Sequence, residues 1–302
     1  MTLVRAGFKK ELQLGLNAVF GLKYKEFQPE WPYIFETFPS RKAYEEDVLV
    51  SGFGVAPDKP EGSPLSYDDA REVFTARYYN TTVALGFAIT EEAVEDNLYA
   101  DQGERYARAL ANSMNHTKEI KGAAVLNNGF SSSFPGGDGV ALFSTAHPMA
   151  NGSTFANTPS TPSDLAEASL EEGLIAIGSF TDDRGIPVQM RARRLIVPVN
   201  SMFIAPRILQ SPYRPGTSDN DINVINQMSL VEDGFHVNHR LTDTDAWFLI
   251  TDCEDGLKHF KRVALQRGME GDFETGNLRY KARERYSFGW SNPRGAWGNP
   301  GA

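Results

Sequence analysis

The strongest constraint on the fold is one long helical pattern in the first half of the chain. It starts at Thr90, a good N-cap residue followed by two glutamates, and it runs to the helix-stop signal "NNG" at 127–129. Apolar side chains recur on one face of this segment, namely Val94, Leu98, Tyr106, Leu110 and Met114. Unbroken, the helix would be roughly 50 Å long, and Gly103 is the position where it could kink. Helices of globular proteins average about 11 to 12 residues, so the pattern predicts a strut.

The segments before the strut predict structures that reach away from a core. Residues 4–20 form an amphipathic helical pattern with an apolar side chain at every fourth position. Between Tyr24 and Phe38 lies an aromatic tract whose prolines predict an extended arm. Residues 48–88 predict a long hairpin whose polar tip, residues 57–69, is rich in Gly, Pro, Ser and Asp.

The part after the strut alternates short helices with short strands. Ser169 and Glu172 form a capping-box pattern that predicts a helix running to Phe180. The stretches "RRLIVPVN" and "DAWFLITD" predict buried strands, and "APRILQS" predicts a helical turn. Residues 278–290 alternate apolar and basic side chains, which predicts a half-buried strand with Glu284 as the one charge on its apolar face. We therefore predict an α+β fold.

The composition narrows the classes of function. The 302 residues allow about two domains, and the net charge of -9 argues against a dedicated nucleic-acid binder. The single cysteine, Cys253, excludes an internal disulfide and a cysteine zinc cluster. No apolar run approaches about 18 residues, and the N-terminal segment lacks a signal-peptide core. We expect no membrane partner and synthesis in the cytoplasm.

The stretch "ALFSTAHPMANGSTFANT" at 141–158 has the residue types of a catalytic site, because Ser144 precedes His147 by three positions. A serine hydrolase that uses this pair is one hypothesis. Such an enzyme needs a nucleophile turn such as G-x-S-x-G, an oxyanion hole and a third group that orients the histidine. The chain contains no G-x-S-x-G, so a structural loop is the favoured interpretation.

Other patterns with the residue types of a site are less specific. His236 and His239 could bind a metal, but they lie in a predicted strand or turn and lack an H-E-x-x-H pattern. Cys253 and His259 flank acidic residues, which raise a thiol pKa and oppose nucleophilic use. "GFGVAP" lacks the third glycine of a dinucleotide fingerprint. Two acidic pairs lack the twelve-residue loop of a calcium site, namely Asp219/Asp221 and Asp243/Asp245. We therefore predict no catalytic residue, no metal site and no cofactor.

Six stretches together carry a family resemblance that extends over most of the chain from about Thr82 onward. They are "GFAITEEAVEDNLY", "LFSTAHP", "DLAEASLEEGLIAIGSFTDDRGIPV", "LIVPVNSMFIAPRIL", "DTDAWFLITD" and "RYSFGWSNPRGAWG". With these stretches and the order of its elements, the chain resembles the major capsid proteins of tailed bacteriophages, which share the Johnson fold. More narrowly, it resembles the Mu-like phage major head subunit family. The arm and the hairpin tip match only in general character.

The resemblance implies a division of the chain into four regions. These are an N-terminal arm (1–47), an E-loop that overlaps adjacent subunits (48–88), a peripheral domain with the spine helix (89–163 and 227–302) and an axial domain (164–226). Ser144 and His147 would lie in a surface loop without chemistry. The expected assembly anchors are Phe20, Trp31, Phe35, Phe53, Lys59, Tyr67, Tyr213 and Arg214.

The resemblance also implies partners. Copies of the subunit would form hexamers and pentamers and close into an icosahedral shell around phage double-stranded DNA. The shell would belong to the virion, after synthesis in the host bacterial cytoplasm. Because the arm starts almost at Met1, we expect a separate scaffold protein, along with portal and decoration proteins. Some relatives cross-link through a lysine and an asparagine, but nothing here identifies an acceptor for Lys59. An encapsulin-like shell around cargo protein and a phage tail or baseplate component are alternatives.

Overall fold

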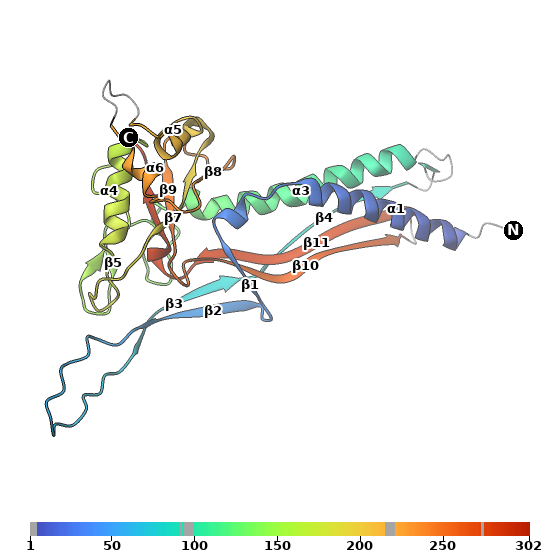
Figure 1. Cartoon of the computed structure of the whole chain (residues 1–302). Coiled ribbons are helices and arrows are strands. Elements are labelled where there is room, and N and C mark those ends of the chain that lie inside the picture. Colours follow the sequence, from blue (N-terminus) through green and yellow to red (C-terminus); the bar gives the residue numbers. More distant parts are fainter. Residues whose placement is uncertain (1–4, 91, 94–98, 215–220, 273–274) are drawn as a thin grey trace.

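The computed structural model describes residues 5–90, 92–93, 99–214, 221–272 and 275–302. The molecule is elongated, with a mixed α/β body at one end (Figure 1). Two long helices and a long sheet extend from this body in one direction, and a two-stranded hairpin projects from it in another. Among the described residues, no helix is both long and apolar enough to cross a lipid bilayer.

The predicted strut is confirmed as α3, Tyr99–Asn127, a helix of 29 residues. At 1.5 Å per residue it is about 44 Å long, and it continues through Gly103 without a break. Leu110 and Met114 are buried, whereas Tyr106 is half exposed and its ring lies 5.6 Å from that of Phe87 in the long sheet. The buried face of α3 also contains small residues, because Ala107 and Ala111 are fully buried. Val94 and Leu98 lie outside the described residues.

Helix α1, Arg5–Glu26, packs along α3 and continues five residues past Gly21. The prediction that an extended arm begins after Gly21 is therefore wrong, because the first helix-breaking residue is Pro29 and packing on α3 supports the additional turn. Leu16 and Phe20 are buried between the two helices and the long sheet. The chain then forms a single 3-10 turn, η1 (Trp31–Tyr33), and a short strand, β1 (Glu36–Pro39).

The long sheet has the strand order β1-β10-β11-β4. Its main strands are β4 (Thr81–Ile89), β10 (Leu257–Gly271) and β11 (Leu278–Trp290), which pair antiparallel, while β1 pairs parallel to β10. The predicted alternation in β11 is confirmed. Its apolar side chains face α1 and α3, and its basic side chains lie on the opposite, solvent-facing side.

The body contains a second sheet of order β12-β9-β7-β8. Its strands are β7 (Ala192–Val197), β8 (Phe235–Val237), β9 (Trp247–Thr251) and β12 (Ala296–Asn299). Around it lie α4 (Glu167–Gly178), α5 (Ile204–Gln210), α6 (Val224–Gln227), η2 (Val199–Ser201) and η3 (Pro293–Gly295). Trp247 and Trp297 are fully buried at the centre, 5.0 Å apart between ring centroids.

Helix α4 starts at Glu167 with Ala166 as its N-cap, three residues before the predicted N-cap Ser169. Ser169 occupies the third helical position, and its Oγ accepts a hydrogen bond from the amide of Ala166 at 2.9 Å. Ser169 therefore caps the helix N-terminus, but it does so from the third helical position. Its side chain reaches back to the backbone of the N-cap residue and is not itself the N-cap. Phe180 lies beyond the end of α4 and is buried in the body core.

The hairpin consists of β2 (Tyr44–Ser51) and β3 (Arg71–Tyr79), joined by the loop 52–70. After Asn80 the chain enters β4, which pairs with β11 in the long sheet. The segment 48–88, expected to form one hairpin, therefore divides between two sheets. The remaining strands, β5 (His147–Pro148) and β6 (Thr154–Phe155), form a small ribbon in the connection between α3 and α4.

Candidate functional site

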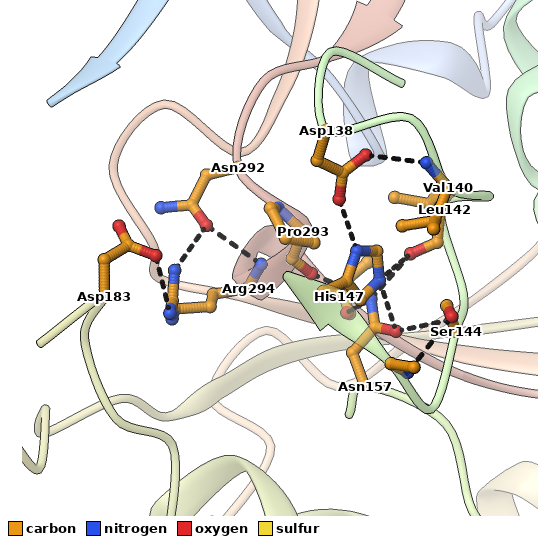
Figure 2. Close-up of polar contacts among 12 residues, drawn as sticks. Asp138, Val140, Leu142, Ser144, His147, Asn157, Asp183, Asn292, Pro293 and Arg294 are labelled. Atoms are coloured by element: carbon orange, nitrogen blue, oxygen red, sulfur yellow. Dashed lines mark hydrogen bonds and ion pairs between the residues drawn. The ribbon is translucent and has the colours of Figure 1, made fainter. Parts of the chain in front are cut away.

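His147, the first candidate catalytic residue, lies at the centre of a buried polar cluster (Figure 2). Its Nδ1 is 2.6 Å from Asp138 Oδ2, and both side chains are almost fully buried. Its Nε2 lies 3.2 Å from the carbonyl oxygen of Leu142 and 3.2 Å from Oδ1 of Asn157. Both ring nitrogens therefore face oxygen atoms of the same subunit.

Asn157 links this cluster to the C-terminal segment. Its Nδ2 group lies within hydrogen-bond distance of three carbonyl oxygens, those of Leu142 (2.7 Å), Pro293 (2.9 Å) and Ala296 (3.2 Å). Its Oδ1 accepts a hydrogen bond from the backbone amide of Ser144 at 2.9 Å. One fully buried side chain thus fixes the loop after α3 against η3 and the start of β12.

This geometry does not fit a serine hydrolase. The Ser144 hydroxyl accepts a hydrogen bond from the amide of Ala146 at 3.2 Å, and no hydrogen bond joins it to His147 in the described chain. In a catalytic triad the histidine nitrogen opposite the aspartate must take the proton of the nucleophile. Here that nitrogen faces Leu142 and Asn157 inside the protein, so the Asp-His pair is a structural connection (Figure 2).

A second buried connection lies beside the first. The guanidinium of Arg294 pairs with Asp183 at 3.2 Å and donates to the carbonyl of Thr181 at 2.6 Å. It also lies 4.8 Å above the ring of Phe155, and both members of the ion pair are buried. Removing either charge would leave the other buried and uncompensated. The two connections together hold the loop after α3, the turn after α4 and the C-terminal segment in one rigid unit.

The other chemical candidates also have structural contacts. His236 stacks on Tyr33 with ring centroids 3.9 Å apart, and burial lowers its pKa. His239 pairs instead with Glu30 at 2.6 Å, so the two histidine side chains contact different partners. No group of three or more metal-ligating side chains occurs in the part of the chain that the structure describes.

Cys253 and His259 show no sign of nucleophilic chemistry. Burial is the main cause that raises the pKa of the Cys253 thiol to about 12, with Asp252, Asp255 and Glu254 adding to it. The thiol is therefore protonated at neutral pH. His259 lies in a separate aromatic cluster, where burial lowers its pKa to about 3. Of the two acidic pairs considered as calcium ligands, the first includes Asp219, which lies outside the described residues. In the second pair, Asp243 accepts hydrogen bonds from the backbone amides of Asp245 and Ala246 in its own turn.

The hairpin carries strongly exposed apolar side chains. Tyr67 is 92% exposed and Val55 is 79% exposed. We add to them four other hairpin side chains with more than a third of their surface exposed, Val48, Val50, Phe53 and Leu65. We call this set the hairpin surface. Exposed apolar groups gathered on a projecting element mark a contact with another molecule.

The base of the hairpin is anchored by a polar network around the buried Lys258. Lys258 of β10 lies 2.6 Å from Asp255 and also contacts the carboxylate of Asp47 in β2. Ser291 donates a hydrogen bond to the same carboxylate, and its hydroxyl lies 2.5 Å from that of Tyr78 in β3. The direction in which the hairpin leaves the body is thus fixed at its base by one charged network.

The eight expected assembly anchors fall into two groups. Phe53, Lys59, Tyr67, Tyr213 and Arg214 are exposed, and Arg214 pairs with Glu167 at 2.9 Å. Phe20 and Phe35 are buried in cores of their own subunit, and Trp31 is partly buried between Lys118, His259 and Phe288. The expectation that Phe20, Trp31 and Phe35 are exposed anchors is therefore corrected, because helix α3 and the long sheet cover their side chains.

Sequence reasoning missed an apolar surface at the opposite end of the body. It lies on η2, α5, α6 and the adjoining loops, where the exposed large side chains are Val199, Met202, Phe203, Ile204, Ile222, Val224 and Met228. Tyr213, which was expected, borders it. We call this set the α5-α6 surface. The available signal was the apolar pair Phe203 and Ile204 at the start of this short helix.

An N-terminal helix, a projecting hairpin, a spine helix, a mixed body and two long closing strands, in this order, make up the Johnson fold of tailed-phage capsid proteins. The class of molecule is a subunit of a protein shell. A sequence profile described as phage capsid protein matches residues 75–299, which is most of the chain. The chain therefore belongs to the phage capsid protein family. Comparison with curated protein sequences gives no match.

Solved structures agree on the fold. The capsid protein of cyanophage P-SCSP1u is similar with a TM-score of 0.58 at 10% identity, over 89% of this chain and 86% of that one. The encapsulin of the holo-SrpI complex from Synechococcus elongatus PCC 7942 gives 0.55 at 10% identity, over 91% and 88%. The procapsid of bacteriophage JBD30 gives 0.51 at 15% identity, over 98% and 76%.

Proposed function

We propose that this chain is a major head subunit that assembles as hexamers and pentamers into a closed icosahedral shell around phage double-stranded DNA. The observation that carries the proposal is the hairpin surface. A two-stranded sheet alone is only marginally stable in water, and no third strand of the described residues pairs with β2 or β3. A neighbouring copy that covers the hairpin would bury its apolar side chains. Many such contacts, each weak, would sum through multivalency into a stable shell.

The four-region division belongs to this proposal. Residues 1–47 would be the N-terminal arm and 48–88 the E-loop that overlaps a neighbour. Residues 164–226 would form the axial domain. The rest, 89–163 and 227–302, would form the peripheral domain. The α5-α6 surface supports the axial assignment, because it offers apolar side chains on the side of the body opposite the hairpin (Figure 1).

We place the subunit in the Mu-like phage group, with synthesis in the host bacterial cytoplasm and separate scaffold, portal and decoration proteins. Its role would be structural and not enzymatic, which the internal contacts of His147 support. A net charge of -9 suits a container that must hold DNA without adhering to it strongly.

Negative-stain electron microscopy with light scattering tests the assembly. The purified chain should form closed shells or five- and six-fold rings, with scaffold co-expressed if needed. Replacing both Phe53 and Tyr67 by serine should abolish these particles and leave the circular dichroism spectrum and melting temperature of the subunit unchanged. The matched control Ser144→Ala should assemble normally. A monodisperse small species under every condition would contradict the proposal.

An encapsulin-like shell is the second candidate, because the encapsulin from Synechococcus elongatus shares the fold over nearly the whole chain. The contents of the particle separate the two functions. Particles from infected or co-expressing cells should contain nuclease-protected DNA if the chain is a phage head protein. A co-purifying enzyme, packaged in place of DNA, would instead establish the encapsulin function.

A further inference from the structure

We propose that Arg184 is a brace that sets the direction of the hairpin loop within the subunit before the loop meets a neighbouring copy. The brace is an intramolecular contact between the turn after α4 and the loop 52–70. Its importance for the shell rests on the proposed function, but the contact itself can be measured in unassembled subunits.

The guanidinium of Arg184 binds the returning branch of the loop at two neighbouring residues. Its Nη1 is 2.6 Å from Asp68 Oδ2, and its Nη2 donates a hydrogen bond to the carbonyl of Asp69. The same Asp68 oxygen accepts a hydrogen bond from the amide of Gly54 at 2.7 Å. Gly54 lies on the outgoing branch and Asp68 on the returning branch, so one carboxylate joins the two branches and one arginine ties them to the body.

The turn that carries Arg184 is itself rigid. Asp182 Oδ1 accepts hydrogen bonds from the amides of Arg184 (2.9 Å) and Ile186 (2.8 Å). Gly185 adopts a φ of 86°, a left-handed conformation that glycine takes without strain. Asp183 is locked by the buried ion pair with Arg294 described above. The arginine therefore presents its charge from a fixed position.

Nothing else in the described chain ties this loop to the body by hydrogen bonds. The network around Asp47 holds the base of the hairpin, but β2 and β3 stop pairing at Ser51 and Arg71. Beyond that point the loop 52–70 makes hydrogen bonds only within itself and to Arg184 among the described residues. The hairpin thus has a strong fixed base and one weaker outer contact.

The outer contact can bias the loop but cannot lock it. The side chain of Arg184 is 23% exposed and that of Asp68 is 47% exposed. Exposed ion pairs shift an equilibrium by about fivefold at most. The subunit would thus hold its loop mainly in one direction while a docking neighbour could still move it. Turn and loop lie in different proposed regions, so the brace also couples the axial domain to the E-loop.

The test compares Arg184→Ala with Arg193→Ala in unassembled subunits isolated by gel filtration. Arg193 forms a similar exposed pair, with Asp233 at 2.9 Å, on the body and away from the hairpin. We expect Arg184→Ala to raise chymotryptic cleavage at Tyr67 and hydrogen exchange of the Gly54 amide about two- to fivefold, and Arg193→Ala to change neither. Arg184→Lys, which keeps a positive charge beside Asp68 and leaves Asp68 as the acceptor for Gly54, should retain most of the slower cleavage.

Equal cleavage and exchange in the wild-type protein and Arg184→Ala would overturn the brace. Equal increases in both variants would overturn it too, because they would indicate general loosening. Particle sizes are measured separately, and Arg184→Ala should give a broader distribution than wild type. If the wild-type chain forms no shell, the proposed function fails while the cleavage result still decides the brace.

Discussion

Glu284 of β11 and Lys118 of α3 form a salt bridge with 3.0 Å between Oε2 and Nζ, and both side chains are almost buried. The other carboxylate oxygen accepts a hydrogen bond from the hydroxyl of Tyr24 in α1 at 2.8 Å. Glu284 is the residue that interrupts the apolar alternation of β11. The interruption has a structural cause, since three elements meet at this one carboxylate.

Replacing Glu284 by alanine should destabilise the unassembled subunit by about 3 to 5 kcal/mol, because Lys118 would stay buried without a counter-charge. Urea unfolding measures the loss. Arg283→Ala, on the exposed side of the same strand, should change stability by less than about 0.5 kcal/mol. The double variant Lys118→Met with Glu284→Leu should recover most of the loss. A Glu284→Ala subunit as stable as wild type would refute the importance of the pair.

Asn157→Ala should cost at least about 2 kcal/mol, because the carbonyls of Leu142, Pro293 and Ala296 would lose their buried donor. Asn157→Asp should cost at least as much, since a carboxylate would bring oxygen against those three carbonyls. Thermal unfolding of subunits compares both variants with Ser144→Ala, which should melt within a degree or so of wild type. Ser144→Ala lowering the melting temperature as far as Asn157→Ala would contradict this prediction.

Glu119 should make the subunit less stable as the pH rises through neutrality. Burial raises its pKa to about 7, although it accepts hydrogen bonds from the amides of Glu30 and Trp31, and the charge of Glu30 adds to the rise. The folded state thus holds a proton that the unfolded state loses near pH 4.5. The associated stability, roughly 3 kcal/mol, is complete below pH 4.5 and disappears as the pH rises through 7.

Melting temperatures at about pH 5.5 and about pH 8 for wild type and Glu119→Gln check this effect. The wild-type melting temperature should fall more between these two values than that of Glu119→Gln. Glu104→Gln, an exposed change on the same helix, serves as the control and should follow wild type. Parallel curves for wild type and Glu119→Gln would show that Glu119 does not titrate in this range.

His259 should act in the opposite direction at lower pH. Its ring lies 4.4 Å from Trp31 and 4.6 Å from Phe288 between centroids, and burial lowers its pKa to about 3. The unfolded chain therefore binds a proton near pH 6.5 that the folded chain refuses, and stability is lost as the pH falls from 6.5 towards 3. His259→Phe should reduce the acid sensitivity of urea unfolding between about pH 6 and about pH 4. An unchanged pH slope would argue against this account.

The sequence predicted the elements whose signals are local. The alternation of β11 and the periodicity of α3 depend on neighbouring residues, so both were recognised, as was the exposed position of Tyr67. The length of α1 was missed, because the turn beyond Gly21 is supported by packing on α3. The role of Asn157 was also missed, since two of its partners are 136 and 139 positions away. Long-range contacts of this kind leave no periodic signal.

The contact between Tyr24 and Glu284 joins positions 260 residues apart. When a ribosome has released α1, the hairpin and α3, the central strand of the long sheet, β11, has not yet been made. The interior of the spine region therefore stays open until translation passes Trp290, and contacts of such high sequence separation form late in folding. Unfinished chains consequently present no complete subunit to their neighbours. The order of synthesis thus leaves the strand that completes the long sheet among the last elements of the chain.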